Sequence, residues 1–323
     1  MPVRVFMAAN SQFEEIEEVK KLLSLHSMVE VDDVHEADLV LAVGDDRCML
    51  DAVQALGEKD VPILGVNTGG AGYLTSIGVD ELGVALEAIA RGEYELATYT
   101  RLKGVVDGHT VVYALNEIAV FPSKSAALMS YELLVDGEPV WSDRADGVIV
   151  ATPLGSTAYA LSAGGAIVFE GARVLEVVPV NSTDVAKRPL IIPDTSTIEI
   201  KGVASKYPCE IVADGGNRVK VKERVVVKRA ETNVRLVRLS SEPSVRETLR
   251  EKLAETLDVP PSAKFVLKVL KLKGPMSARE LAEETMLPER TVRRALSELQ
   301  RRGLVRRIVN LRDARQFFYE ALM

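Results

Sequence analysis

The segment over residues 144–165 combines residue types that suit nucleotide binding. Arg144 and Asp146 carry opposite charges directly before a β-branched strand over 148–150. A Pro-Leu-Gly turn, several small side chains and the ring of Tyr159 follow. Small residues let a ligand lie close to the backbone, and a tyrosine ring offers a stacking face. The composition therefore indicates a nucleotide-binding loop, although a tight turn with a buried glycine corner would use similar residues.

Two acidic residues stand where a predicted strand meets a predicted helix. The segment Val43-Gly-Asp-Asp-Arg47 follows an apolar run and precedes a helical pattern. In an open α/β sheet, ligands bind at the carboxyl ends of the strands. Asp45 and Asp46 are therefore candidate site residues.

A glycine-rich loop follows the next predicted strand. It reads Gly65-Val-Asn-Thr-Gly-Gly-Ala-Gly-Tyr-Leu74. Glycines such as Gly69 and Gly72 permit left-handed turns and close contact between backbone and ligand. A plain connection between a strand and a helix is the alternative interpretation.

A polar pair interrupts an apolar strand. Asn116 and Glu117 lie at the centre of the run over 114–120. Burial of an amide beside a carboxylate is unfavourable unless both find partners. The pair is therefore expected to serve a ligand or a structural network.

These segments, in this order, resemble the signatures of the NAD kinase family. The resemblance covers about residues 1–258 and is strong over 144–165 and 188–200. Asn116-Glu117 and Val212-Ala-Asp-Gly also follow the family pattern. The resemblance implies an α/β N-terminal domain with a parallel sheet, followed by a β-rich domain.

The resemblance also implies an activity. The family transfers the γ-phosphate of Mg-ATP to the 2′-hydroxyl of the adenosine ribose of NAD, which yields NADP. Asp45 resembles the aspartate that activates this hydroxyl, and a positioned carboxylate can orient a hydroxyl and accept its proton. The cofactor-binding residues implied in the same way are Asp46, Arg47, Asn67, Gly69, Gly72, Asn116, Glu117, Arg144, Asp146, Thr157, Ala158, Tyr159, Ala160, Leu161 and Ser162.

The phosphate side departs from the family pattern Gly-Gly-Asp-Gly-Thr. Val43, Asp46 and Arg47 replace the first glycine, the third glycine and the threonine. A carboxylate at such a loop repels a triphosphate unless Mg²⁺ bridges them. Either Asp46 is an extra metal ligand and Arg47 supplies charge to the phosphates, or ATP no longer binds. Two milder departures are Leu154 in place of a hydroxylated residue and Gly216 in place of the glutamine of Asp-Gly-Gln.

Alternating patterns predict the elements that position these residues. Strands are predicted over 3–8, 38–43 and 61–66, and helices over 13–25, 48–56 and 80–91. Short connections between them imply right-handed crossovers and a parallel sheet. Residues 94–239 alternate β-branched runs with turn residues and predict an antiparallel β region. We expect domains over 1–98, 99–258 and 259–323, with a closing helix in the second that starts at a capping box of Ser244 and Glu247.

The last 65 residues resemble a winged helix-turn-helix domain of the α+β class. Helices are predicted over 263–273, 277–286 and 289–302, and strands over 304–308 and 316–319. The third helix would enter a major groove while the wing tip contacts phosphates. The candidate DNA-binding residues are Arg290, Arg293, Arg294, Arg301, Arg312 and Arg315. A helical oligomerisation module with a solvated basic face is the alternative.

The charge distribution supports this division. Residues 260–323 hold 14 Lys and Arg against 7 Asp and Glu, while the remainder holds 26 against 40. The net charge of −7 therefore conceals an acidic body and a basic tail. A basic tail predicts contact with a polyanion such as double-stranded DNA.

Several classes of protein are disfavoured. No apolar run approaches the roughly 18 residues of a membrane span, and the N-terminus lacks the layout of a signal peptide. We therefore expect a cytoplasmic protein without membrane association, and a homo-oligomer. Cys48, Cys209 and the three histidines share no metal-binding spacing and are interpreted as structural.

Three functions remain open. The first is an NAD kinase that uses Mg-ATP or polyphosphate and carries an appended DNA-binding domain for transcription regulation. The second is a catalytically inactive regulator that senses NAD(P) or a related phosphorylated metabolite. The third is a kinase acting on another hydroxylated substrate. Retention of Asp45 favours the first, whereas the altered loop after Val43 favours the second.

Overall fold

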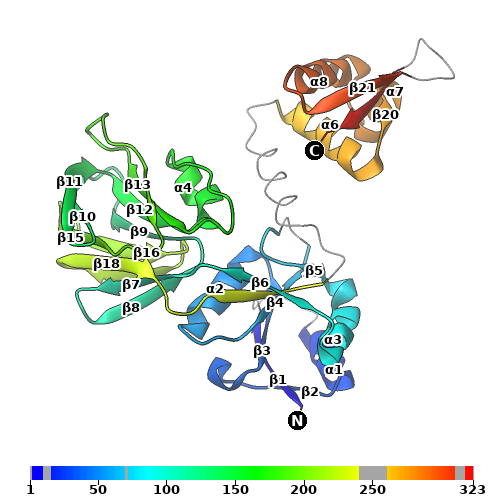
Figure 1. The fold of residues 1–323 in the computed structure, drawn as a ribbon. Coiled ribbons are helices and arrows are strands. Elements are labelled where there is room, and N and C mark those ends of the chain that lie inside the picture. The colour runs from blue at the N-terminus through cyan, green and yellow to red at the C-terminus, as the bar shows by residue number, and fades with distance from the viewer. Residues whose placement is uncertain (1, 10–15, 70–71, 240–259, 310–316, 323) are drawn as a thin grey trace. The chain divides into compact units, whose positions relative to one another are not determined.

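The protein consists of two compact units, Met1–Glu242 and Pro243–Met323. The structure is a computed structural model, shown in Figure 1, and it describes residues 2–9, 16–69, 72–239, 260–309 and 317–322. The predicted closing helix with Ser244 and Glu247 falls outside these residues, as do Arg312 and Arg315. The first unit contains an α/β part and a β-rich part, and the second unit is small and mainly helical.

A mainly parallel sheet organises the α/β part (Figure 1). In spatial order its strands are β2 (Met28–Glu30), β1 (Val3–Ala9), β3 (Leu39–Gly44), β4 (Ile63–Asn67), β19 (Val234–Arg238) and β6 (Glu95–Tyr99), with β5 (Ile77–Gly78) beside β4. Only β19 and β6 pair antiparallel within the described part of this sheet. Every residue of β3 is buried, which fits a central strand covered on both faces.

Helices cover both faces of this sheet. The helices are α1 (Ile16–Leu25), α2 (Asp46–Leu56) and α3 (Leu82–Arg91), and short 3₁₀ turns span Val34–Glu36 and Val79–Glu81. Apolar residues of α1 and α3, such as Leu23 and Leu86, pack with Leu41 of β3. Met49 of α2 packs with Val40 of the same strand. Alternate residues of β3 therefore contact opposite helical layers, because successive side chains of a strand point to opposite faces.

The predicted strands and helices of this part are confirmed, with shifted bounds. Helix α2 begins two residues before the predicted Cys48, because Asp45 caps it. Residues 13–15 of the predicted first helix lie outside the described residues. The sequence analysis did not predict β2. It also assigned Val234–Arg238 to the β-rich region, whereas this strand joins the first sheet between β4 and β6. That return pairs residues far apart in the sequence, and local patterns do not encode such pairing.

Two antiparallel sheets form the β-rich part. One runs β11 (Glu138–Ala145), β10 (Met129–Val135), β15 (Ile198–Ser205), β18 (Arg224–Arg229), β7 (Leu102–Val106) and β8 (Thr110–Ala114). The other runs β14 (Leu190–Pro193), β13 (Val174–Val180), β12 (Gly147–Ala151), β9 (Glu117–Pro122), β16 (Cys209–Ala213) and β17 (Asn217–Val221). The predicted antiparallel β region is thus confirmed apart from β6 and β19.

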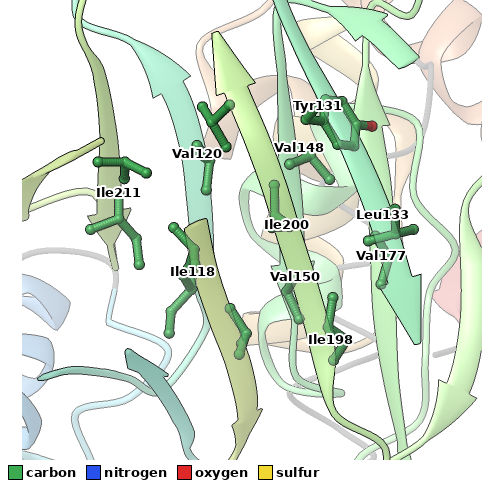
Figure 2. Close-up of a cluster of buried hydrophobic side chains, with 14 of the residues drawn as sticks. Ile118, Val120, Tyr131, Leu133, Val148, Val150, Val177, Ile198, Ile200 and Ile211 are labelled. Carbon is green, nitrogen blue, oxygen red and sulfur yellow. The ribbon is translucent and has the colours of Figure 1, made fainter. Parts of the chain in front are cut away.

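The inner faces of these sheets share one apolar core. Figure 2 shows Ile118, Val120, Val148, Val150, Val177 and Ile211 from one sheet, and Tyr131, Leu133, Ile198 and Ile200 from the other. Truncation of a fully buried isoleucine or leucine of this kind to alanine typically costs about 2–5 kcal/mol. The core therefore holds rigid the strand ends that carry the polar residues described below.

A short helical turn covers the outer face of the second sheet. After β12, the chain forms a 3₁₀ turn over Gly155–Thr157 and helix α4 (Tyr159–Ser162). Ala160 of α4 is buried with Ile149, Ala151 and Val178 of the sheet. Side chains as small as alanine let this segment lie close to the strands.

The second unit has three helices and a small sheet in its described part. Its elements are α6 (Pro261–Lys273), β20 (Met276–Ser277), α7 (Ala278–Thr285), α8 (Glu289–Arg301), β21 (Val305–Val309) and β22 (Phe317–Ala321). Strand β22 pairs antiparallel with both β20 and β21. The predicted capping box is present, since Ser277 and Glu280 bond each other's backbone N–H. The winged-helix prediction is therefore confirmed at the level of the fold. None of the described helices combines the length and apolar character needed to cross a membrane.

The turn between α7 and α8 supplies a test of backbone strain. Met286 adopts a left-handed conformation with φ of 55°, and its side chain is 92% exposed. This conformation is unfavourable for residues other than glycine. We expect Met286→Gly to stabilise α7 and α8 by about 1 kcal/mol, measured by hydrogen exchange of their amides. Met286→Ala, which keeps the strain, is the control; equal protection in both variants would contradict the prediction.

Candidate functional site

The first turn of α2 carries the candidate catalytic carboxylate. Asp45 is the N-cap, and its Oδ1 accepts the N–H of Arg47 at 3.0 Å. The side chain lies at the carboxyl end of β3 and is exposed. The partial positive charge of a helix N-terminus favours a carboxylate here. Asp45 is therefore held in place while remaining open to a ligand.

Asp46 ties α2 to the glycine-rich loop. Its carboxylate accepts the N–H of Tyr73 at 2.9 and 3.0 Å and that of Leu74 at 2.8 Å. Backbone N–H groups of a glycine loop are the donors that a phosphate would otherwise meet. The chain's own carboxylate takes these two donors, a contact that the sequence did not predict.

The other predicted residues of this loop shape its backbone. Oδ1 of Asn67 accepts the N–H of Gly69 at 3.0 Å, and Gly69 has a φ of 119°. A Cβ at Gly72 would lie 1.9 Å from Oγ1 of Thr75, so no larger residue fits without rearrangement. Asn67, Gly69 and Gly72 therefore set a tight turn after β4.

Arg47 reaches across to the β-rich part. One guanidinium nitrogen donates to the backbone carbonyl of Asp214 at 2.8 Å. The other lies 2.8 Å from Oδ1 of Asp51, one turn along α2. The Arg47 side chain thus joins the start of α2 to the turn between β16 and β17.

Asp214 holds the start of β9. Its carboxylate accepts the N–H groups of Leu115 at 2.8 Å, Asn116 at 2.9 Å and Glu117 at 3.1 Å. Asp214 is buried and has a φ of 46°. The sequence analysis matched the motif around this residue but assigned it no role. The sequence pattern that could have indicated a role for Asp214 is a carboxylate followed by two glycines between two strands.

Glu117 is a buried carboxyl group that the described residues leave partly unsatisfied. It is 6% exposed, and none of them bonds its Oε2. Burial, and then the charge of Asp214, raise the pKa of Glu117 from 4.5 to about 8. Burial also raises the pKa of Asp214 to about 6, against the opposing effect of its three N–H donors. Near neutral pH the proton therefore resides on Glu117, which can donate a hydrogen bond.

The turn after β12 packs directly on the backbone of Leu115 and Asn116. The backbone N–H of Thr152 donates to the carbonyl of Asn116 at 2.9 Å. The Thr152 hydroxyl donates to the carbonyl of Leu115 at 2.7 Å and accepts the N–H of Gly155 at 3.0 Å. A Cβ at Gly155 would lie 2.0 Å from the Asn116 oxygen, so only glycine fits. Hydrogen bonds thus join the turn over 152–155 to residues 115–116, which are far away in the sequence.

The predicted nucleotide-binding stretch continues along α4. Oγ1 of Thr157 donates to the Leu154 carbonyl at 3.2 Å, and Ala158 leads into α4 with a φ of −97°. Tyr159 is 46% exposed, and its ring centroid lies 5.8 Å from that of Phe121. Exposure increases along the next three residues, with Ala160 buried, Leu161 intermediate and Ser162 exposed. Tyr159 therefore offers a supported aromatic face.

Two predicted residues lie at the opposite end of β12. Asp146 precedes the strand, whereas the Thr152 turn follows it, and five residues of strand span about 16 Å. Oδ2 of Asp146 accepts a hydrogen bond from the Asn181 amide at 2.9 Å. Arg144 is exposed on β11. Within this chain, Arg144 and Asp146 are therefore separated from Asn116 by the length of the strand.

Glu176 is a buried acidic residue that the sequence analysis missed. It pairs with Ala151 in β12, and Ala151 pairs with Glu117 on its other side. Glu176 is 1% exposed, and its Oε1 accepts the N–H of Ala166 at 2.5 Å. Burial raises its pKa. Its place within an apolar strand was a signal of the kind that singled out Glu117.

Across the described ranges, no three His, Cys, Asp or Glu side chains are arranged to hold a metal ion. On α8, Arg293 pairs with Glu289 at 2.7 Å, and Arg301 pairs with Glu298 at 2.6 Å. Arg290 and Arg294 are exposed and have no acidic partner among the residues that the structure describes.

Family models match nearly the whole chain. Residues 2–94 match the ATP-NAD kinase N-terminal domain, and residues 115–239 match the ATP-NAD kinase C-terminal domain. Residues 257–316 match the MarR family. The order of these matches agrees with the resemblances drawn from the sequence.

Individual relatives agree with the family models. An NAD kinase of Methanothermobacter thermautotrophicus is 35% identical over 222 residues, which cover 68% of this chain and 77% of that protein. The crystal structure of an NAD kinase from Archaeoglobus fulgidus in complex with ATP has a TM-score of 0.65 at 27% identity, covering 77% of this chain and 98% of the other. Yeast NADH kinase complexed with NADH shares the fold, with a TM-score of 0.70 at 21% identity over 80% of this chain and 89% of the other.

The protonated state of Glu117 predicts a pH dependence of stability. A carboxyl group whose pKa rises from 4.5 to about 8 on folding contributes stability that is present below pH 4.5 and lost as the pH rises through 8. We expect the urea midpoint of the first unit, followed by fluorescence of the single Trp141, to fall across this range. Glu117→Gln should flatten the decline, whereas Glu95→Gln, on the exposed start of β6, should not. An unchanged decline in Glu117→Gln would refute the assignment.

Proposed function

Because this chain belongs to the NAD kinase family of phosphotransferases, we propose that it phosphorylates NAD at the adenosine ribose 2′-hydroxyl to form NADP. One observation carries the proposal. Asp45, which the family resemblance marks as the activating carboxylate, is joined through Arg47 and Asp214 to the backbone of Asn116 and Glu117. The phosphate side and the NAD side therefore belong to one bonded framework.

Asp45 would orient the ribose hydroxyl and accept its proton. The hydroxyl oxygen forms a bond to the γ-phosphorus of the donor, and the bond from that phosphorus to the β,γ-bridging oxygen breaks, which releases ADP. Asn116 and the protonated Glu117 would bind NAD, and Tyr159 would stack on it. Mg²⁺ neutralises phosphate charge when bound. The exposed carboxylate of Asp45 would supply one oxygen ligand to an ion that arrives with the nucleotide.

ATP is the proposed donor. The Archaeoglobus fulgidus relative, which aligns over most of this chain, contains ATP. Polyphosphate is the donor to be compared with ATP in the same assay.

The catalytic proposal predicts the effect of a single substitution. Purified protein with NAD, ATP and Mg²⁺ should yield NADP, measured by chromatography. Asp45→Asn should lower the rate by about 10²–10⁴-fold, because the amide cannot accept the proton. Asp33→Asn is the matched control, since Asp33 likewise caps a helical turn and accepts the N–H of the residue two positions on.

Two outcomes would overturn the kinase proposal. The first is an equal loss of rate in both variants. The second is an absence of NADP with either donor, together with NAD(P)-dependent binding of DNA. That result would establish the catalytically inactive regulator considered above, whose main support is the occupied loop around Asp46.

We further propose that the second unit binds duplex DNA and serves in transcription regulation. Its match to the MarR family, its three helices and its excess of basic residues support this proposal. Helix α8 follows the turn after α7, the position of a recognition helix in this class of domain. Its buried side, which includes Val292, Leu296 and Leu299, leaves the arginines on the exposed side.

The ion pairs on α8 rank its arginines. Arg290 and Arg294 can engage DNA without losing an acidic partner, whereas Arg301 and Arg302 share Glu298. We expect Arg290→Ala with Arg294→Ala to weaken binding of a mixed-sequence duplex and to reduce the salt slope by about 2. Arg301→Ala with Arg302→Ala removes the same charge and should weaken binding less. Equal affinities in an anisotropy titration would contradict this ranking.

A further inference from the structure

Two departures from the family pattern lie against each other in this structure. Arg47 replaces a threonine at the start of α2, and Gly216 replaces a glutamine after β16. They are far apart in the sequence and belong to different parts of the first unit. A Cβ built on Gly216 would nevertheless lie 1.4 Å from a terminal nitrogen of Arg47 and 2.3 Å from its Cζ. The guanidinium thus fills the space of a side chain at 216.

The backbone itself does not demand glycine at 216. Its neighbour Gly215 has a φ of 70°, in the left-handed region that disfavours side chains, whereas Gly216 does not lie in this region. A residue with a side chain could therefore adopt the Gly216 backbone. The nearest atoms that such a side chain would meet belong to the Arg47 guanidinium, which would have to leave its present position.

The seated guanidinium completes a chain of hydrogen bonds. The N–H of Arg47 donates to the Asp45 carboxylate at 3.0 Å, and its side chain donates to the Asp214 carbonyl at 2.8 Å. The Asp214 carboxylate then accepts the N–H groups of Asn116 and Glu117. The candidate catalytic carboxylate and the candidate NAD-binding pair are thereby fixed to one another.

We propose that Arg47 is a positioning residue, seated on Gly216, that sets the placement of Asp45 relative to Asn116 and Glu117. The proposal rests on the kinase function proposed above. Arg47 acts through this placement and not as the principal phosphate ligand, because Asp214 and Asp51 already engage its two terminal nitrogens. In this account the two departures form a compensating pair, and the altered loop remains compatible with catalysis.

A double-mutant thermodynamic cycle tests the contact between Arg47 and Gly216 without any measurement of activity. Gly216→Gln should lower the Tm of the first unit by roughly 3 °C, because the added side chain displaces the guanidinium from its bonds to Asp214 and Asp51. The same change in the Arg47→Thr background should lower the Tm by less than about 1 °C, since the space is then free. Equal decreases in both backgrounds would overturn the proposal.

A kinetic arm separates positioning from phosphate binding. Arg47→Thr should lower kcat by about tenfold to a hundredfold, as expected for misplacement of reacting groups. The Kd values of ATP and NAD, from calorimetry, should change by less than about threefold. The double variant Arg47→Thr with Gly216→Gln should recover most of kcat. A loss of ATP affinity equal to the loss of kcat would instead assign Arg47 to the phosphates and refute the positioning role.

A control and a separate failure mode complete the design. Asp51→Asn removes the exposed partner of Arg47 but leaves the bond to Asp214, so kcat should stay within about threefold of the unaltered protein. If the unaltered protein forms no NADP, the kinase proposal fails. The Tm measurements still decide whether Arg47 packs against Gly216. Equal decreases of Tm in the two backgrounds overturn the inference on their own.

Discussion

The carboxylate of Asp214 is the interaction on which the site depends. It accepts hydrogen bonds from three consecutive backbone N–H groups at the start of β9. The backbone carbonyl of the same residue accepts a hydrogen bond from the Arg47 side chain. A carboxylate with several backbone donors is strongly held even when buried. The strand ends of the β-rich part are thereby anchored to the first turn of α2. Removal of the Asp214 carboxylate would leave the N–H groups of Leu115, Asn116 and Glu117 without this acceptor, whereas the backbone carbonyl that Arg47 contacts would remain.

Burial around this anchor determines the charge of the site. Burial, and then the negative charge of Asp214, raise the pKa of Glu117, so that Glu117 keeps a proton near neutral pH. One carboxyl group thus acts as an acceptor of backbone hydrogen bonds, and the adjacent one becomes a donor. The Asp46 carboxylate orders the glycine-rich loop in a comparable way, through its backbone N–H groups. Three acidic residues of the candidate site, Asp45, Asp46 and Asp214, thus bind backbone N–H groups of the protein itself.

The two units of the chain differ in their balance of charge. The first unit has an acidic balance, and its Arg47 is held at defined contacts. The second unit is basic and carries exposed arginines on one helix. Each unit has an apolar core of its own, as expected of separate domains. Their order in the chain agrees with the three family matches.

Much of the fold and the candidate site could be predicted from the sequence alone. Periodic apolar residues and turn residues determine strands and helices locally, and the order of motifs marked Asp45, Asn116 and Tyr159 as site residues. Local patterns could not show that β19 returns to the first sheet, or that Glu176 lies buried in β13 opposite Ala151 of β12. Nor could they show that Arg47 is seated on Gly216. Only the tertiary structure decided these points, because each depends on which distant residues pack together, and pairing across long stretches of chain leaves no periodic signal.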